Sequence, residues 1–182
     1  MKLSDGEKLI LLMLADMYKN LKIKGDFDPD FISRTIHDNH LWGFNHHYSG
    51  IPFEGEEDRP PEVAETINIL DMWSFLEDSY KGLSAADKKK VEKDAEPFGK
   101  NPKFNGFDGN NEDHYHIANY VVRHLESFPS FKGRDLNAHM PTIDGYRRMY
   151  VLFDSIRPKL VGRLLTADEV VKILNVRRHP GP

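Results

Sequence analysis

Apolar residues in this chain recur with the 3.6-residue spacing of an α-helix, and this spacing constrains its fold more than any other feature. The clearest example lies between Pro61 and Gly82. There, Ile69, Trp73 and Leu76 fall on one broad apolar stripe, which predicts a central helix with Trp73 buried. No run of useful length alternates apolar and polar residues as a half-buried strand does, and no internal repeat is present. The chain is therefore predicted to be all-α.

Capping signals divide the chain into about seven predicted helices. Ser4 with Glu7 is a capping box, in which each residue satisfies a backbone donor of the other, and Thr166 with Glu169 is a second one. Thr142 is the expected N-cap of a further helix. Proline and glycine set the remaining boundaries. The predicted helices cover about residues 5–22, 29–37, 61–82, 85–95, 111–128, 143–157 and 167–174.

A chain of 182 residues with 39% hydrophobic residues is predicted to form one compact helical bundle. Residues 38–60 show no periodic pattern, so a long irregular loop is expected between the second and third helices. Trp42 lies in that loop and is expected to be at least partly exposed. A candidate interaction surface consists of four aromatic residues: Trp42, Phe44, Tyr48 and Phe107.

The first predicted helix is apolar almost all the way round its axis. The run from Leu9 to Leu14 leaves no broad polar face. A helix of this kind is buried on more than one side. The simpler interpretation is burial in the core of the chain, and the alternative is burial against a second subunit, which predicts a homo-oligomer.

Charge and composition exclude several classes of protein. The formal net charge of −4 is not the basic balance of a dedicated nucleic-acid binder, so no nucleic-acid partner is expected. The absence of cysteine excludes disulfides and thiolate metal sites and suits the reducing cytoplasm, where we place the protein. The longest apolar run, Leu9–Ala15, has seven residues, whereas a membrane span needs about 20. No phosphate-binding loop or dinucleotide fingerprint is present, and no cofactor is expected.

Histidines suggest one candidate metal site. His46 and His47, with Glu54 or Glu56, would make a composite set of ligands. The spacing of the other histidines does not match the metalloprotease pattern, which needs two histidines four residues apart with a glutamate between them.

Arg134 and His139 form the sharpest catalytic candidate. Their spacing is similar to the short motif of the all-helical HEPN ribonucleases, in which such a pair implies RNA cleavage without a metal. An arginine can clamp a phosphate through its planar fork, while a histidine can transfer a proton near neutral pH. Gly133 and Pro141 bracket the pair and predict a loop, whereas those enzymes use a helix. The alternative is that Arg134 is exposed and His139 packs near Thr142.

Several stretches in the second half resemble the YfbU family of bacterial proteins. They are Phe104–Asp108, Leu136–Pro141, the helix with Tyr146, Arg147 and Met149, and Leu165–Asn175. The resemblance implies a helical fold and one domain over residues 1–175. Arg177, Arg178 and His179, followed by Pro180–Pro182, predict a flexible tail over residues 176–182. That family has no established biochemical activity, so the resemblance implies no mechanism.

The stretch Phe104–Asp108 has two interpretations. In the preferred one, its two phenylalanines fill the bundle while Gly106 permits a tight turn. In the other, it is a loop that docks a protein partner. Together, these observations predict a non-catalytic cytosolic interaction or regulatory protein that self-associates, with a metal-independent ribonuclease as the alternative.

Overall fold

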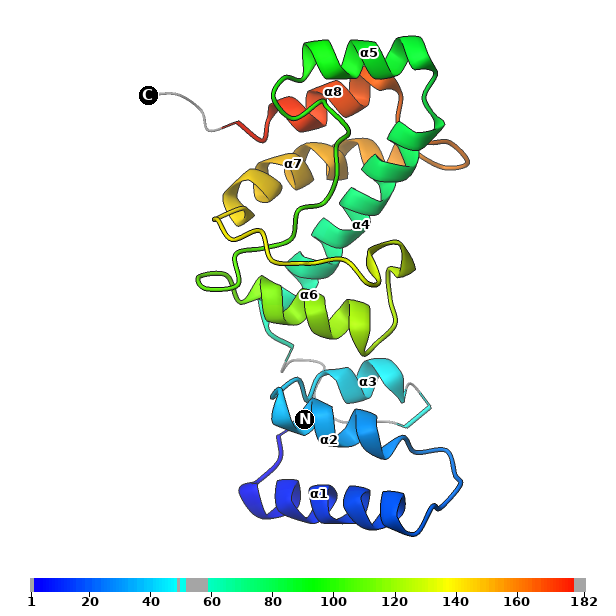
Figure 1. Cartoon of the computed structure of the whole chain (residues 1–182), viewed down its shortest axis with the longest axis vertical. Helices are drawn as coiled ribbons and strands as arrows, with labels where there is room; N and C mark the ends of the chain where they lie inside the picture. Colours follow the sequence, from blue (N-terminus) through cyan, green and yellow to red (C-terminus); the bar gives the residue numbers. More distant parts are fainter. Residues whose placement is uncertain (1, 49, 52–58, 179–182) are drawn as a thin grey trace. The chain divides into compact units, whose positions relative to one another are not determined.

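The computed structural model describes residues 2–48, 50–51 and 59–178. Within these ranges the chain is all-α, as predicted, with eight α-helices and two short 3₁₀ helices (Figure 1). No β-strand forms in this part of the chain, where an isolated bridge joins Phe107 to Asn137. None of the described helices is both long enough and apolar enough to cross a membrane.

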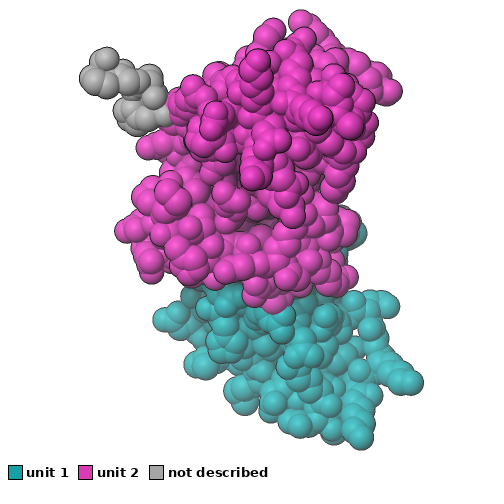
Figure 2. All heavy atoms as spheres, turned by 45° about the horizontal axis from the view of Figure 1, so that its top comes forward, with its two compact units in different colours: residues 1–60 teal, residues 61–182 magenta. Residues whose placement is uncertain are grey.

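The chain divides into two compact units, residues 1–60 and residues 61–182 (Figure 2). The first unit contains α1 (Asp5–Asn20), α2 (Pro29–His37) and α3 (Gly43–His47). The second unit contains α4 (Pro61–Gly82), α5 (Ala85–Asp94), α6 (His114–Arg123), η2 (Pro129–Phe131), α7 (Ile143–Ile156), η3 (Arg157–Lys159) and α8 (Ala167–Asn175). One folding domain over residues 1–175 stays a prediction.

Both predicted capping boxes are present. At the start of α1, the Ser4 amide donates to the Glu7 carboxylate over 2.7 Å, and the Ser4 hydroxyl accepts from the Glu7 amide over 3.3 Å. Thr166 and Glu169 exchange the same two bonds at the start of α8. These residues satisfy backbone donors that the first turn of a helix leaves unpaired, which explains where both helices begin.

The prediction of an irregular loop over residues 38–60 is wrong at Gly43–His47, where the short helix α3 forms. The Phe44 ring packs edge-on against the Phe31 ring of α2, with centroids 5.9 Å apart. Trp42 is only 8% exposed, so its expected exposure is also wrong. A helix of five residues is too short to show a periodic pattern, and contacts with α2 stabilise it instead.

Helix α4 lies at the centre of the second unit, where α6, α7 and α8 pack against it (Figure 1). Trp73, in the middle of α4, is fully buried, as predicted. Its ring centroid lies 5.4 Å from that of Tyr146 and 6.1 Å from that of Phe104. Burial raises the pKa of the Tyr146 phenol to about 12. This aromatic cluster is the core of the second unit.

Helix α6 ends at Arg123, several residues before the predicted end near residue 128. The Leu125 amide donates to the Tyr120 carbonyl, five residues earlier, instead of continuing the α-helical ladder. Glu126 and Phe128 then adopt left-handed conformations, with φ of 50° and 55°. Apolar spacing continues past Arg123, but the backbone turn stops the helix.

Glu112 satisfies the first backbone donors of α7 from a distant part of the chain. Its carboxylate accepts from the Thr142 amide over 2.6 Å and from the Ile143 amide over 2.8 Å. Thr142 occupies the predicted N-cap position, but its hydroxyl does not cap the helix and instead lies 3.1 Å from the Gly106 carbonyl oxygen. The cap therefore comes from a residue 30 positions earlier.

The stretch Phe104–Asp108 packs in the core, as the preferred interpretation predicts. Phe104 and Phe107 are both buried. Phe107 donates its amide to the Leu136 carbonyl over 2.9 Å, and its own carbonyl accepts from Ala138 over 2.8 Å. Gly106 has a φ of +90°, and a Cβ there would collide with the Leu136 carbonyl. Glycine is therefore required where the two segments cross.

Residues after α8 contact the second unit as far as the structure describes them. Arg148 donates to the carbonyls of Val176 and Arg177 over 3.0 and 2.8 Å. The Arg177 guanidinium lies 5.2 Å from the centroid of the Tyr146 ring and 5.8 Å from that of Trp73. Residues 179–182 of the predicted tail lie outside the described residues.

Candidate functional site

Arg134 is engaged in a bidentate ion pair. Its two terminal nitrogens each lie 2.8 Å from a carboxylate oxygen of Glu77, on α4. Glu77 is buried and also accepts from the Phe104 amide over 2.9 Å. The carboxylate raises the pKa of the Arg134 guanidinium. Because both terminal nitrogens of the Arg134 guanidinium bind Glu77, the ion pair holds α4 to the segment after η2.

His139 lies apart from that ion pair. Its side chain is 71% exposed and its Nε2 lies 3.9 Å from an Asp135 carboxylate oxygen. Its backbone has a φ of 54°, which the Asn137 side chain stabilises by accepting from the His139 amide over 2.9 Å. A polar hollow of about 550 Å³ lies beside Arg134, and His139 is not among its described lining residues. The described structure gives the two residues no shared substrate-binding cleft.

His46 and His47 are adjacent on α3, but their environments differ. His47 stacks on Phe31, with ring centroids 4.1 Å apart. Partial burial, together with the positive charges of Arg59 and His47, lowers the pKa of His46. Glu54 and Glu56, the expected carboxylate ligands, lie outside the described residues. Among the residues described, no three His, Asp or Glu side chains gather closely enough to hold a metal ion.

The four aromatic residues of the candidate interaction surface occupy different places. Trp42, Phe44 and Phe107 are buried, so they do not form an exposed patch. Tyr48 is half-buried and accepts from the Asp28 amide over 3.0 Å, and burial raises the pKa of its phenol. Only Phe44 and Tyr48 border an open apolar groove.

A three-residue ionisable cluster joins α4, α6 and α7, and no spacing or motif in the sequence predicted it. Glu65 accepts two bonds from Arg147, over 2.7 and 2.9 Å. His114 Nε2 lies 2.7 Å from the same carboxylate. The hydrogen bonds from Arg147 lower the pKa of Glu65. His114 is buried beneath the Phe107 ring, so this cluster fixes three helices and leaves the imidazole no access to a substrate.

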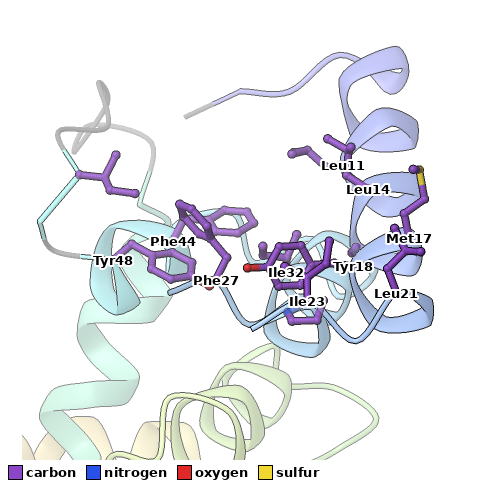
Figure 3. A pocket seen from close by; sticks show the side chains of 13 residues that line it. Leu11, Leu14, Met17, Tyr18, Leu21, Ile23, Phe27, Ile32, Phe44 and Tyr48 are labelled. Carbon is purple, nitrogen blue, oxygen red and sulfur yellow. The ribbon is translucent and has the colours of Figure 1, made fainter. Parts of the chain in front are cut away.

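An apolar groove of about 490 Å³ lies in the first unit, between α1 and α3 (Figure 3). All of its lining residues are apolar or aromatic, and five of the thirteen come from α1: Leu11, Leu14, Ala15, Met17, Tyr18, Leu21, Ile23, Phe27, Pro29, Ile32, Phe44, Tyr48 and Ile51. Figure 3 shows the α1 side chains on one side and Phe44 and Tyr48 on the other. A groove of this composition suits an apolar occupant and offers almost no polar group for chemistry.

Helix α1 exposes an apolar surface that continues from the groove. Six of its own or immediately following side chains are each more than half exposed: Leu9, Ile10, Met13, Leu14, Met17 and Leu21. Ala15 is the only residue of the helix that is buried. The simpler interpretation of this all-round apolar helix, burial in the core of the chain, is therefore wrong. The pattern showed that α1 is apolar, but it could not show which side the rest of the chain covers.

Comparisons with known proteins identify the family of the chain. The model of the YfbU domain matches residues 1–176. The chain is 27% identical over 177 residues to the UPF0304 protein MJECS11 of Methanocaldococcus jannaschii, an alignment that covers 92% of this chain and 98% of that protein. No solved structure matches the chain. Because the domain model matches nearly the whole sequence, the chain belongs to the YfbU family.

Proposed function

We propose that this YfbU-family chain is a non-catalytic cytoplasmic interaction or regulatory protein that self-associates through the apolar surface of its first unit. The observation that carries the proposal is the row of α1 side chains that are more than half exposed. Contiguous apolar surface of this kind marks interaction sites, because leaving it in water is unfavourable. The lack of cysteine is compatible with the cytoplasm.

The amount of apolar surface supports a second copy as the partner. Nine large apolar side chains of the first unit are substantially exposed: Leu9, Ile10, Met13, Leu14, Met17, Leu21, Ile23, Phe27 and Ile51. Burying one such side chain removes roughly 80 Å² from water, so the nine offer on the order of 700 Å² in each copy. A standard interface buries about 800 Å² on each partner. The surface is therefore close to what a stable dimer needs.

The ribonuclease alternative has less support. Arg134, the residue that would bind the phosphate, donates hydrogen bonds from both terminal nitrogens to the Glu77 carboxylate. Breaking that pair would leave a buried carboxylate without its cation, which costs several kcal/mol. The His139 side chain is exposed to solvent, and its Nε2 lies 3.9 Å from the Asp135 carboxylate, too far for a hydrogen bond that would orient the ring for proton transfer.

A matched pair of variants tests the proposal. Ile10→Glu combined with Met17→Glu places two charges on the exposed α1 face, while Val161→Glu makes the same kind of change at a 91% exposed site in the second unit. Sedimentation velocity should show a dimer for the unmodified protein and for Val161→Glu, and a monomer for the α1 variant. Circular dichroism should show equal helix content in all three.

A dimer that survives the α1 substitutions, or an unmodified protein that is monomeric, would overturn the proposal. If the double variant loses helix content, the milder Ile10→Gln replaces it. That change should raise the dissociation constant of the dimer at least tenfold, because it leaves a desolvated amide in the interface.

A further inference from the structure

We propose that α1 pairs antiparallel with α1 of a second copy of this chain, across a two-fold axis that passes between Met13 and Leu14. The inference rests on the proposed self-association and adds the orientation and register of the two helices. In this arrangement α1 is the central contact of the dimer, and the apolar face of α1 in each copy is buried by α1 of the other copy.

The exposed face of α1 has the symmetry that a two-fold interface requires. In a closed dimer, the same patch is used twice, so residue i contacts residue j and residue j contacts residue i. Five of its exposed apolar residues, together with Gly6, are spaced symmetrically about its midpoint, and the exposed Leu9 lies outside this symmetric set. At about 100° per residue its members fall within a band roughly 100° wide. They pair as Gly6 with Leu21, Ile10 with Met17, and Met13 with Leu14.

The two ends of this face are complementary in size. Leu21, which directly follows α1, is 65% exposed. A Cβ built at Gly6, on the first turn, would meet nothing within 4 Å. Antiparallel pairing places the Leu21 side chain of one copy over the open space at Gly6 of the other. Small residues at such crossings let two helices approach closely, so the pairing buries both ends of the face.

The helix dipole favours the antiparallel over the parallel orientation. Antiparallel neighbours place the opposite partial charges of their ends side by side, whereas parallel neighbours place like partial charges together. The side-chain charges do not decide between the two, because each end of α1 carries both signs. Lys8 lies 3.7 Å from Asp5 at the start of the helix, and Asp26 and Asp28 follow Lys22 and Lys24 after its end.

The same pairing also covers the groove of the first unit. Leu14, Met17 and Leu21 belong both to the exposed face and to the wall of the groove. A helix laid along the exposed face therefore borders the groove opening as well. One contact with a second copy removes from water both the face and the adjacent part of the groove.

Cysteine cross-linking distinguishes the orientations, because the chain has no cysteine of its own. A disulfide requires Cα atoms within about 7 Å. Met13→Cys lies beside the axis and should form a cross-linked dimer on oxidation. Ile10→Cys and Met17→Cys should each fail alone, because seven residues separate equivalent positions by about 10 Å along the axis. An equimolar mixture of those two variants should form the mixed dimer.

The outcomes separate this inference from the proposed self-association. Val161→Cys, on the second unit, should stay uncross-linked and is the negative control. If Ile10→Cys cross-links with itself, the helices are parallel, and the inference fails although self-association stands. If no α1 variant cross-links in a protein that is dimeric by mass, the interface lies elsewhere and the inference fails. A monomeric protein would overturn both.

Discussion

Arg134 and Glu77, which are 57 residues apart in sequence, form a two-armed ion pair with both nitrogen–oxygen distances at 2.8 Å. The Glu77 side chain is 4% exposed, so the carboxylate has little contact with water. A buried carboxylate needs this cation, since its own desolvation is costly. The residue that best resembled a phosphate clamp is therefore part of the scaffold of the second unit.

Substitution of Arg134 should reduce stability, whereas substitution of His139 should not. Arg134→Ala leaves Glu77 buried without its cation and should lower the free energy of unfolding by about 3 kcal/mol. His139→Ala removes an exposed ring and should change it by less than about 0.5 kcal/mol. Urea denaturation measures both. A loss below about 1 kcal/mol for Arg134→Ala would contradict the structural role of the pair.

The protein should not cleave RNA. Purified protein incubated with single-stranded RNA in EDTA should leave the RNA intact, because Arg134 is held by Glu77 and His139 is not oriented. Gel electrophoresis of the RNA is the measurement. Cleavage that disappears in both Arg134→Ala and His139→Ala would establish the ribonuclease alternative. Cleavage that persists in both variants would exclude this motif as its source.

Both tryptophans should contribute to stability. Trp73 is fully buried among aromatic rings, so Trp73→Ala should cost about 3 to 5 kcal/mol, the usual range for deleting a large buried aromatic side chain. Trp42 is also buried, so Trp42→Ala should cost at least about 2 kcal/mol. Denaturant titration followed by circular dichroism measures these losses. A Trp42→Ala variant as stable as the unmodified protein would show that this ring is not part of a core.

Stability should fall in acid because of Glu169. Arg163 donates to its carboxylate over 2.8 and 2.9 Å, and these bonds lower the pKa of Glu169 to about 2, from an ordinary value of 4.5. A carboxyl group with a lowered pKa stabilises the fold above its ordinary pKa, and this contribution is lost as the pH falls from about 4.5 to about 2. Solvent screening limits it to about 1 kcal/mol.

The variant Glu169→Gln isolates that contribution, because glutamine preserves the capping box but removes the charge. It should be about 1 kcal/mol less stable than the unmodified protein at pH 7, and the difference should shrink toward zero near pH 2. Urea denaturation over this pH range measures it. Glu92→Gln, at an exposed position of α5, is the control and should not change stability. A difference that stays constant with pH would contradict the assignment.

The sequence predicted those parts of the fold that depend on local signals. Capping boxes at Ser4 and Thr166 marked where helices begin, and the apolar stripe around Trp73 identified the central helix. Helix α3 was missed because it is stabilised by contact with α2. The cap that Glu112 supplies to α7 was missed because no local pattern links positions 30 residues apart.

The candidate site was harder to predict for the same physical reason. Spacing brought Arg134 and His139 together as a motif, but it could not reveal that Glu77 already binds the guanidinium. The apolar character of α1 was evident from its sequence. Its exposure was not, because hydrophobicity alone does not determine which other segment covers a helix face.

The molar mass of the unmodified protein in solution tests the account most directly. Light scattering at micromolar concentration should give about 42 kDa, twice the 21.0 kDa of one chain, because the exposed face of α1 is buried against a second copy. Dilution should shift the mass toward that of one chain, since the association is reversible. A mass of 21.0 kDa at every concentration would contradict the account.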